Sequence, residues 1–180
     1  MLLTRTTSAF PVRRLDPRTR RTGNTLRGVI TSHMSSTDEI VSQLFSRPSL
    51  PPLEPGTNVY APELTPKIAK LREHKFVVAA LHLANDDIHH AHLIAQDNEG
   101  DPTADLLHAT LHRREGDYWN LKYWWSHVES HPTIRKISDA KSFVDACEDI
   151  NKRGGDDTPL RQRQWEELRA LVEWTRKNCH

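Results

Sequence analysis

Apolar side chains recur at helical spacing along most of the chain. From Thr65 to Leu83, and again beyond Ser138, they return every three or four residues, which places them on one face of a helix. Turn-forming residues separate the periodic segments at Asn85–Asp87, Asn98–Pro102, Gly116–Asp117, His131–Pro132 and Gly154–Gly155. No segment of strand length alternates strictly between apolar and polar residues. The pattern therefore predicts an all-α chain.

After residue 64, the turns divide this pattern into six segments. We expect the helices to cover Thr65 to Leu83, Ile88 to Ala95, about 103–115, about 118–129, Ser138 to the residues before Gly154, and Thr158 to Lys177. The residues from Leu107 to Pro132 follow the outline of a tetratricopeptide-type hairpin, in which Gly116 permits the tight turn. One such unit does not predict a superhelical array, because a stack needs about three repeats. The sequence predicts about five to six helices built as stacked, tetratricopeptide-like hairpins.

Two different segments precede these helices. Ser36 and Glu39 have capping-box spacing, which predicts the start of a short helix. Residues 48–66 contain six of the eleven prolines, so they are expected to form an extended arm, either free or laid across the domain surface. The predicted organisation is a basic leader or disordered tail over 1–33, a short helix and proline-rich arm over 34–64, and a helical domain over 65–180.

The net charge of +1 conceals two regions of opposite sign. Residues 1–33 contain seven Arg, no Lys and one acidic residue, which gives +6 and leaves −5 for the rest. A mildly acidic body argues against a nucleic-acid partner, because phosphate binding needs a clustered basic face. The leader also contains nine Ser or Thr, a composition typical of a mitochondrial presequence and hence of a matrix protein. The alternatives are a disordered basic tail and translation from Met34, with a cytoplasmic location.

Simple counts argue against two further classes of protein. The longest purely apolar run, Phe76–Leu81, is far shorter than the roughly 20 residues needed to span a bilayer. Two cysteines, Cys147 and Cys179, provide neither a disulfide framework nor a zinc-finger spacing. We therefore expect no membrane partner.

Histidine is the residue type that stands out, because nine of the eleven histidines lie between His74 and His131. His108 and His112 are four residues apart and project from one helical face, which Glu115 extends. Imidazole is the commonest metal ligand and a natural general acid or base near neutral pH. The spacing leaves three interpretations open: a metal site, a metal-free polar pocket, and histidines with only a structural role.

Five aromatic residues lie within eight positions, from Tyr118 to Trp125. They cannot all face the core from a single helix, so we expect one or two to line a groove or contact the proline arm.

The stretch from Asn85 to Pro132 contains an ordered set of polar and aromatic residues. They are Asn85, Asp86, Asp87, His92, Gln96, His108, His112, Arg113, Arg114, Glu115, Asp117, Asn120, Tyr123, Trp124, His131 and Pro132. In order and spacing this set resembles the shared core of a family of small, mostly uncharacterised fungal and bacterial proteins. The resemblance covers about 48 of the 180 residues. It implies a shared site without a particular activity, and it favours His92, His108, His112 and His131 over the other histidines.

Two hypotheses for function follow. In the first, a polar pocket walled by Trp124 or Trp125 binds a small ligand or a divalent metal ion and performs acid–base chemistry. The candidate catalytic residues of this pocket are His108, His112 and Glu115. Its candidate metal ligands are His92, His108, His112 and His131. Its candidate ligand-binding residues are His92, Gln96, Arg113, Arg114, Asp117, Asn120, Trp124 and His131. In the second, the chain is a non-enzymatic, tetratricopeptide-like module that binds a peptide or protein. No spacing identifies the cofactor, the substrate or the oligomeric state.

Overall fold

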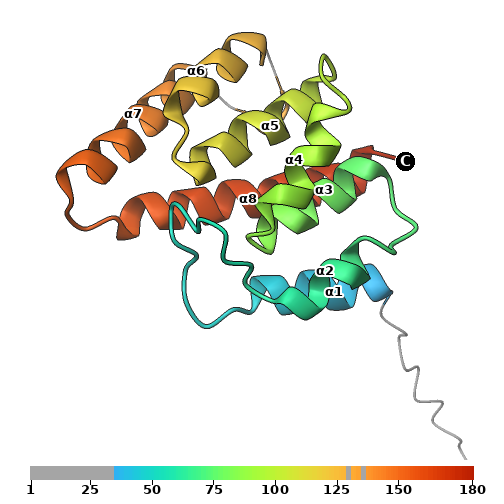
Figure 1. Ribbon diagram of the computed structural model, residues 1–180. Coiled ribbons are helices and arrows are strands. Elements are labelled where there is room, and N and C mark those ends of the chain that lie inside the picture. The colour runs from blue at the N-terminus through green and yellow to red at the C-terminus, as the bar shows by residue number, and fades with distance from the viewer. Residues whose placement is uncertain (1–34, 129–130, 135–136) are drawn as a thin grey trace, which may run out of the picture. The chain divides into compact units, whose positions relative to one another are not determined.

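A computed structural model describes residues 35–128, 131–134 and 137–180 (Figure 1). This part of the chain contains eight α-helices, one short 3-10 helix and no strand. The elements are α1 (Ser36–Phe45), η1 (Pro62–Leu64), α2 (Thr65–Ile68), α3 (Lys75–Ala84), α4 (Ile88–Gln96), α5 (Pro102–Glu115), α6 (Tyr118–His127), α7 (Ile137–Arg153) and α8 (Thr158–Asn178). The all-α prediction is confirmed for these residues, whereas the predicted leader over 1–33 lies outside them. None of the described helices combines the length and apolar character needed to cross a membrane.

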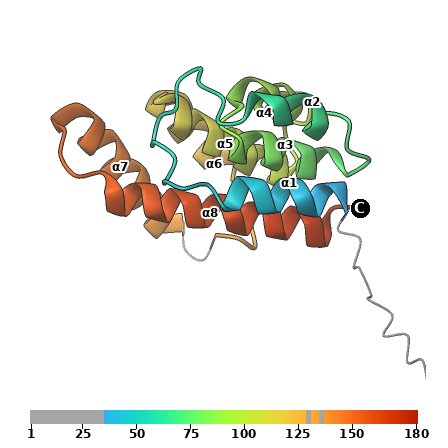
Figure 2. The same ribbon diagram turned by 90° about the horizontal axis from the view of Figure 1, so that it is seen from below.

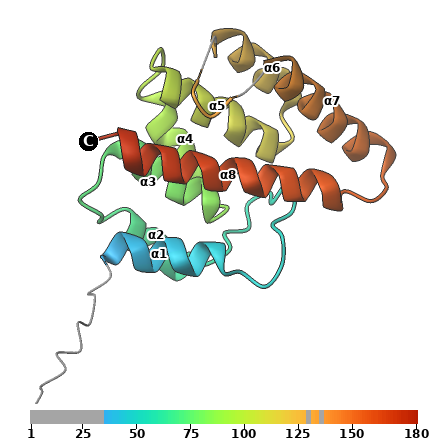
Figure 3. The same ribbon diagram turned by 180° about the vertical axis from the view of Figure 1, so that it is seen from behind.

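Four helices follow one another in space as they do along the chain. α3 packs on α4, α4 on α5 and α5 on α6, while the long helix α8 lies across α3 and also contacts α7 (Figures 1 and 3). The core between them is aliphatic, and Leu83, Leu107, Leu111 and Leu168 are among its fully buried members. Burial of each such side chain contributes about 2 kcal/mol. The apolar stripes of the sequence are therefore the faces along which these helices meet.

The short helix α1 lies alongside α8 (Figure 2). The rings of Phe45 and Trp165 have centres 4.7 Å apart, and the Arg169 guanidinium lies 4.6 Å from the centre of the Phe45 ring. At the other end of α1, Asp38 pairs with Arg176. These contacts join α1 to the same compact unit as the helices that follow it.

The capping box of the first helix lies one residue earlier than predicted, and polar residues at two later helix starts have other partners. Ser35, not Ser36, caps α1: its hydroxyl accepts from the Asp38 amide at 3.1 Å, and the Asp38 carboxylate accepts from the Ser35 amide at 3.3 Å. Thr65 and Asp87 stand at helix starts, but neither side chain makes a cap hydrogen bond among the described residues. Instead, the Thr65 hydroxyl donates to Asp87 Oδ2 at 2.7 Å. Sequence alone does not distinguish a cap from a tertiary contact, because both use the same oxygen atoms.

The predicted helix from Thr65 to Leu83 is two helices, α2 and α3, with residues 69–74 between them. His74 begins the second one, since its Nδ1 accepts from the Phe76 amide at 3.3 Å. Leu71, in the connecting segment, still packs against the core. The apolar spacing therefore continues through a break that it does not reveal.

The proline-rich arm is laid against α8 instead of being free. Arg161 donates to the carbonyl of Pro51 at 2.8 Å and to that of Leu50, and Gln164 donates to the carbonyl of Leu53 at 3.2 Å. Proline has no backbone N–H and cannot join a helical hydrogen-bond ladder, so carbonyls in such a segment need donors from elsewhere. Side chains of α8 supply them here.

The aromatic residues of α6 divide as their crowding predicts. The Tyr118 hydroxyl donates to Glu54 of the arm at 2.7 Å, so one aromatic does contact that segment. Trp119 and Tyr123 point outward, with exposures of 79% and 53%. Trp124 and Trp125 face the interior of the helical unit and pack with its core.

Candidate functional site

Three histidines from two neighbouring helices meet at one place. His108 and His112 lie one turn apart on α5, and His92 reaches them from α4, which precedes α5 in the chain and packs against it. One ring nitrogen from each lies within 4.8 Å of the others. The Nε2 atoms of His92 and His108 are 3.1 Å apart. The four-residue spacing on α5 thus produces the pair that it predicts, and α4 adds the third ring.

Two carboxylates border this group. Glu115 Oε2 lies 2.8 Å from His112 Nδ1, and Glu115 Oε1 lies 3.7 Å from His92 Nδ1. Asp117 lies farther out, 4.0 Å from His112 Nδ1, and accepts a hydrogen bond from the Asn120 amide group at 2.5 Å. Both carboxylates are partly exposed, so they mark the side from which solvent reaches the histidines.

His108 is the most enclosed member of the group. It is 3% exposed, and its ring stacks on Trp124 with centres 3.9 Å apart and planes inclined by 19°. Burial, followed by repulsion from His112 and His92, lowers the pKa of His108 to about 4, against an opposing attraction from Glu115. The ring is therefore neutral at physiological pH. Its Nδ1 is buried and has no hydrogen-bond partner among the described residues.

This buried group of histidines could hold a metal ion. Metal ions bind neutral imidazole, which is the form that burial imposes on His108. Two nitrogen ligands of a tetrahedral ion with bonds of about 2.0–2.1 Å lie roughly 3.3 Å apart, close to the 3.1 Å between His92 and His108. The contact between His112 and Glu115 matches the usual arrangement in which a carboxylate holds the second nitrogen of a ligand histidine.

Other residues predicted for this site lie elsewhere. His131 contacts Thr133 through Nδ1 at 2.7 Å, and its ring packs edge-on against Trp174 of α8. No group of described residues with converging metal-ligand atoms includes it. Gln96 is exposed on α4. His131 follows the end of α6, and the packing of that segment against α8 determines where its ring points.

The two arginines predicted to bind the ligand both pair with acidic residues inside the protein. Arg114 is fully buried and pairs with Asp86 at 2.5 Å. Arg113 pairs with Glu167 of α8 at 2.8 Å. Adjacent positions on a helix differ by about 100° in direction, so two neighbouring arginines and His112 cannot all face one pocket.

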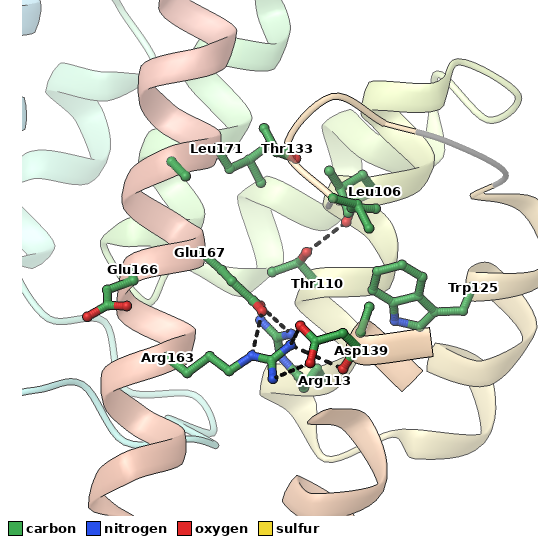
Figure 4. A pocket seen from close by; sticks show the side chains of 13 residues that line it. Leu106, Thr110, Arg113, Trp125, Thr133, Asp139, Arg163, Glu166, Glu167 and Leu171 are labelled. Carbon is green, nitrogen blue, oxygen red and sulfur yellow. Dashed lines mark hydrogen bonds and ion pairs between the residues drawn. The ribbon is translucent and has the colours of Figure 1, made fainter. Parts of the chain in front are cut away.

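A cavity of about 340 Å³ lies between α5, α6, α7 and α8 (Figure 4). Trp125 and Arg113 line it, and Glu167 bridges Arg113 and Arg163 on one side, at 2.8 and 3.2 Å. None of the three clustered histidines lines it. The histidine group and this cavity are therefore separate features, and Trp124, not Trp125, is the wall of the histidine group.

His82, Asp87 and His90 form a second cluster, which the sequence does not predict. His82 of α3 and His90 of α4 both contact Asp87, the residue just before α4, at 2.9 and 2.7 Å. Their ligand atoms also lie within 4.8 Å of one another. The only sequence signal was the nearness of Asp87 to the His89–His92 run, since His82 lies on a different helix.

Comparison with known proteins adds no relative: no protein-family model, curated protein or solved structure matches the chain. The candidate site therefore rests on the geometry of His92, His108 and His112 with Glu115 and Trp124, in an all-helical protein.

Proposed function

We propose that the protein binds one divalent transition-metal ion through His92, His108 and His112. The observation that carries this proposal is the convergence of one ring nitrogen from each histidine within 4.8 Å. Imidazole ligands suit zinc, iron, copper and nickel better than magnesium or calcium, which prefer oxygen. Three protein ligands leave a position for water or substrate, as in catalytic zinc sites.

Acid–base chemistry on a small ligand is the activity that this arrangement supports. A bound ion of this kind polarises a substrate oxygen or activates water. Glu115 Oε2 accepts a hydrogen bond from His112 Nδ1 at 2.8 Å and thereby fixes the orientation of that ring. Its other oxygen lies 3.7 Å from His92 Nδ1, and the side chain is partly exposed, so this carboxylate is placed to take up or return a proton. Trp124 covers the opposite side of His108 and excludes water from it.

The resemblance to the uncharacterised fungal and bacterial family extends this proposal. His92, His108, His112 and Glu115 are among the residues that carry the resemblance. We propose that members of that family share this metal-binding group. Arg114 and Asp86, which also carry the resemblance, form a buried ion pair.

The test is metal binding by matched variants of α4. The chain is stripped with a chelator and titrated with Zn²⁺ and with Co²⁺ by calorimetry, with metal content measured after dialysis. We expect His92→Asn to remove one equivalent of bound metal. Glu115→Gln should lower the metal affinity about 10–100-fold. His89→Asn is the control, because His89 is exposed on the same helix and outside the group. Equal stoichiometry and affinity in His92→Asn and the unmodified chain would refute the proposal.

A tetratricopeptide-like interaction module is the second candidate. It is favoured by the α5–α6 hairpin, whose turn residue Gly116 is left-handed at φ 76°, and by the outward-facing Trp119 and Tyr123. The clustered histidines would not contact a peptide bound to this module, since His108 and His112 are buried and His112 pairs with Glu115. In this case Trp119→Ala would abolish binding to a synthetic peptide array, and His92→Asn would leave that binding unchanged.

A further inference from the structure

Asp87 is the centre of a polar cluster between α3 and α4. Its Oδ2 contacts His82 Nδ1 at 2.9 Å, and its Oδ1 contacts His90 Nδ1 at 2.7 Å. The hydroxyl of Thr65 donates to Oδ2 at 2.7 Å. The two imidazole rings stack with centres 5.0 Å apart and planes inclined by 17°. Two nitrogen donors and a carboxylate thus meet at one point.

The cluster is buried on one side and accessible on the other. His82 and Asp87 are almost completely enclosed, whereas the His90 side chain is 45% exposed. Burial lowers the pKa of His82, against the attraction of Asp87, so this ring is held neutral. Burial would raise the pKa of Asp87, but hydrogen bonds from His90 and Thr65 outweigh it and lower that pKa. The cluster therefore offers neutral nitrogen and ionised oxygen donors.

We propose that His82, Asp87 and His90 form a second site for a divalent transition-metal ion. Two ligands of one ion with bonds of about 2.1 Å lie roughly 3.0 Å apart at a right angle and roughly 3.4 Å apart at the tetrahedral angle. The observed nitrogen–oxygen contacts of 2.9 and 2.7 Å would therefore lengthen by a few tenths of an ångström when an ion binds. Two histidines and one carboxylate form the set that holds Fe²⁺ or Zn²⁺ with positions left for other ligands. The exposed edge of His90 is the side on which those positions lie.

This site is distinct from the one proposed above. His90 and His92 are two residues apart on α4, so they point about 200° apart around the helix. His90 faces α3, where it meets His82, and His92 faces α5, where it meets His108. Because α4 lies between α3 and α5, an ion bound on one face does not share ligands with an ion bound on the other.

Thr65 gives the second site a supporting contact. Its hydroxyl fixes one oxygen of Asp87, so the carboxylate is oriented before an ion arrives. The same contacts also tie α2, α3 and α4 together, which is the purely structural role that the experiment must separate from metal binding.

The experiment uses the full chain carrying His92→Asn, which disables the metal site proposed for His92, His108 and His112. Chelator-treated protein is titrated with Zn²⁺ alone and then with Co²⁺, whose visible spectrum reports its ligands. We expect one equivalent of bound metal in this background and a rise in melting temperature when Zn²⁺ is present. Adding His90→Asn should abolish both, whereas adding His89→Asn should leave both unchanged. His90 is partly exposed, so its replacement is compatible with folding, which circular dichroism verifies.

Two results would overturn the proposal. The first is a folded His92→Asn chain that binds no Zn²⁺ or Co²⁺, which would leave the cluster as a structural hydrogen-bond group only. The second is binding that survives His90→Asn, which would place the ion elsewhere. Failure of the first proposed site is measured separately. It would appear as equal metal binding by the unmodified chain and by the chain carrying His92→Asn alone.

Discussion

Asp86 and Arg114 provide the sharpest test of how this fold is held together. Asp86 has a left-handed backbone, at φ 60°. Its buried carboxylate pairs with two arginines, with Arg114 at 2.5 Å and with Arg47 at 3.0 Å. Arg114 is fully buried and also donates to the carbonyl of Leu83 at 2.7 Å. The ion pair therefore links α5 to the end of α3 and to the segment after α1.

Removal of Asp86 leaves the buried guanidinium groups of Arg114 and Arg47 without their shared counterion, and removal of Arg114 leaves Asp86 paired with Arg47 alone. Loss of one partner of a buried ion pair costs about 3–5 kcal/mol. Arg114→Met also removes the side-chain hydrogen bond to the Leu83 carbonyl, which keeps its hydrogen bond from the Asp86 amide at 3.2 Å. Asp86→Asn removes the charge and retains a side chain that tolerates a left-handed backbone, so it separates electrostatics from backbone strain. The double variant removes both charges, and we expect it to lose less than the sum of the single variants by about 1–3 kcal/mol.

Urea unfolding followed by circular dichroism measures these changes. With a slope of about 2 kcal/mol per molar urea, each single variant should lower the midpoint by roughly 1.5–2.5 M. Arg72→Met and Asp97→Asn are matched surface controls and should stay within about 0.5 kcal/mol. Single variants that each cost less than about 1 kcal/mol, with additive effects in the double variant, would refute a stabilising role for this ion pair.

Two further predictions concern acid stability and the α5–α6 turn. His108 has a pKa of about 4 when folded and 6.5 otherwise, so the unfolded chain binds an extra proton between these pH values. The free energy of unfolding of the metal-free protein should therefore fall as pH drops from about 6.5 to 4, and His108→Asn should reduce that slope. Gly116→Ala should lower the melting temperature more than Gly100→Ala does. Both glycines have positive φ, but only at Gly116 would a Cβ meet Glu54, at 2.8 Å. Equal melting temperatures for the two alanine variants would contradict this explanation.

Local patterns predicted the helices well. Apolar spacing, together with turn residues, placed α4 to α8 within a few residues of their observed bounds, because these signals act within one or two turns of the chain. The same local geometry brought His108, His112 and Glu115 together, since positions three and four apart share a helical face. The capping prediction failed by one residue at α1, where Ser35 and Asp38 form the capping box, because adjacent serines carry the same hydroxyl group.

The sequence by itself determined which segments are helical and which side chains on one helix point the same way, because both follow from the 3.6-residue period. Only the tertiary structure decided which helices face each other. It brought His92 to His108 and His82 to His90, turned His131 toward Trp174, and buried Arg114 against Asp86. The physical reason is that contacts between helices depend on how whole apolar faces pack, which no single stretch of residues specifies.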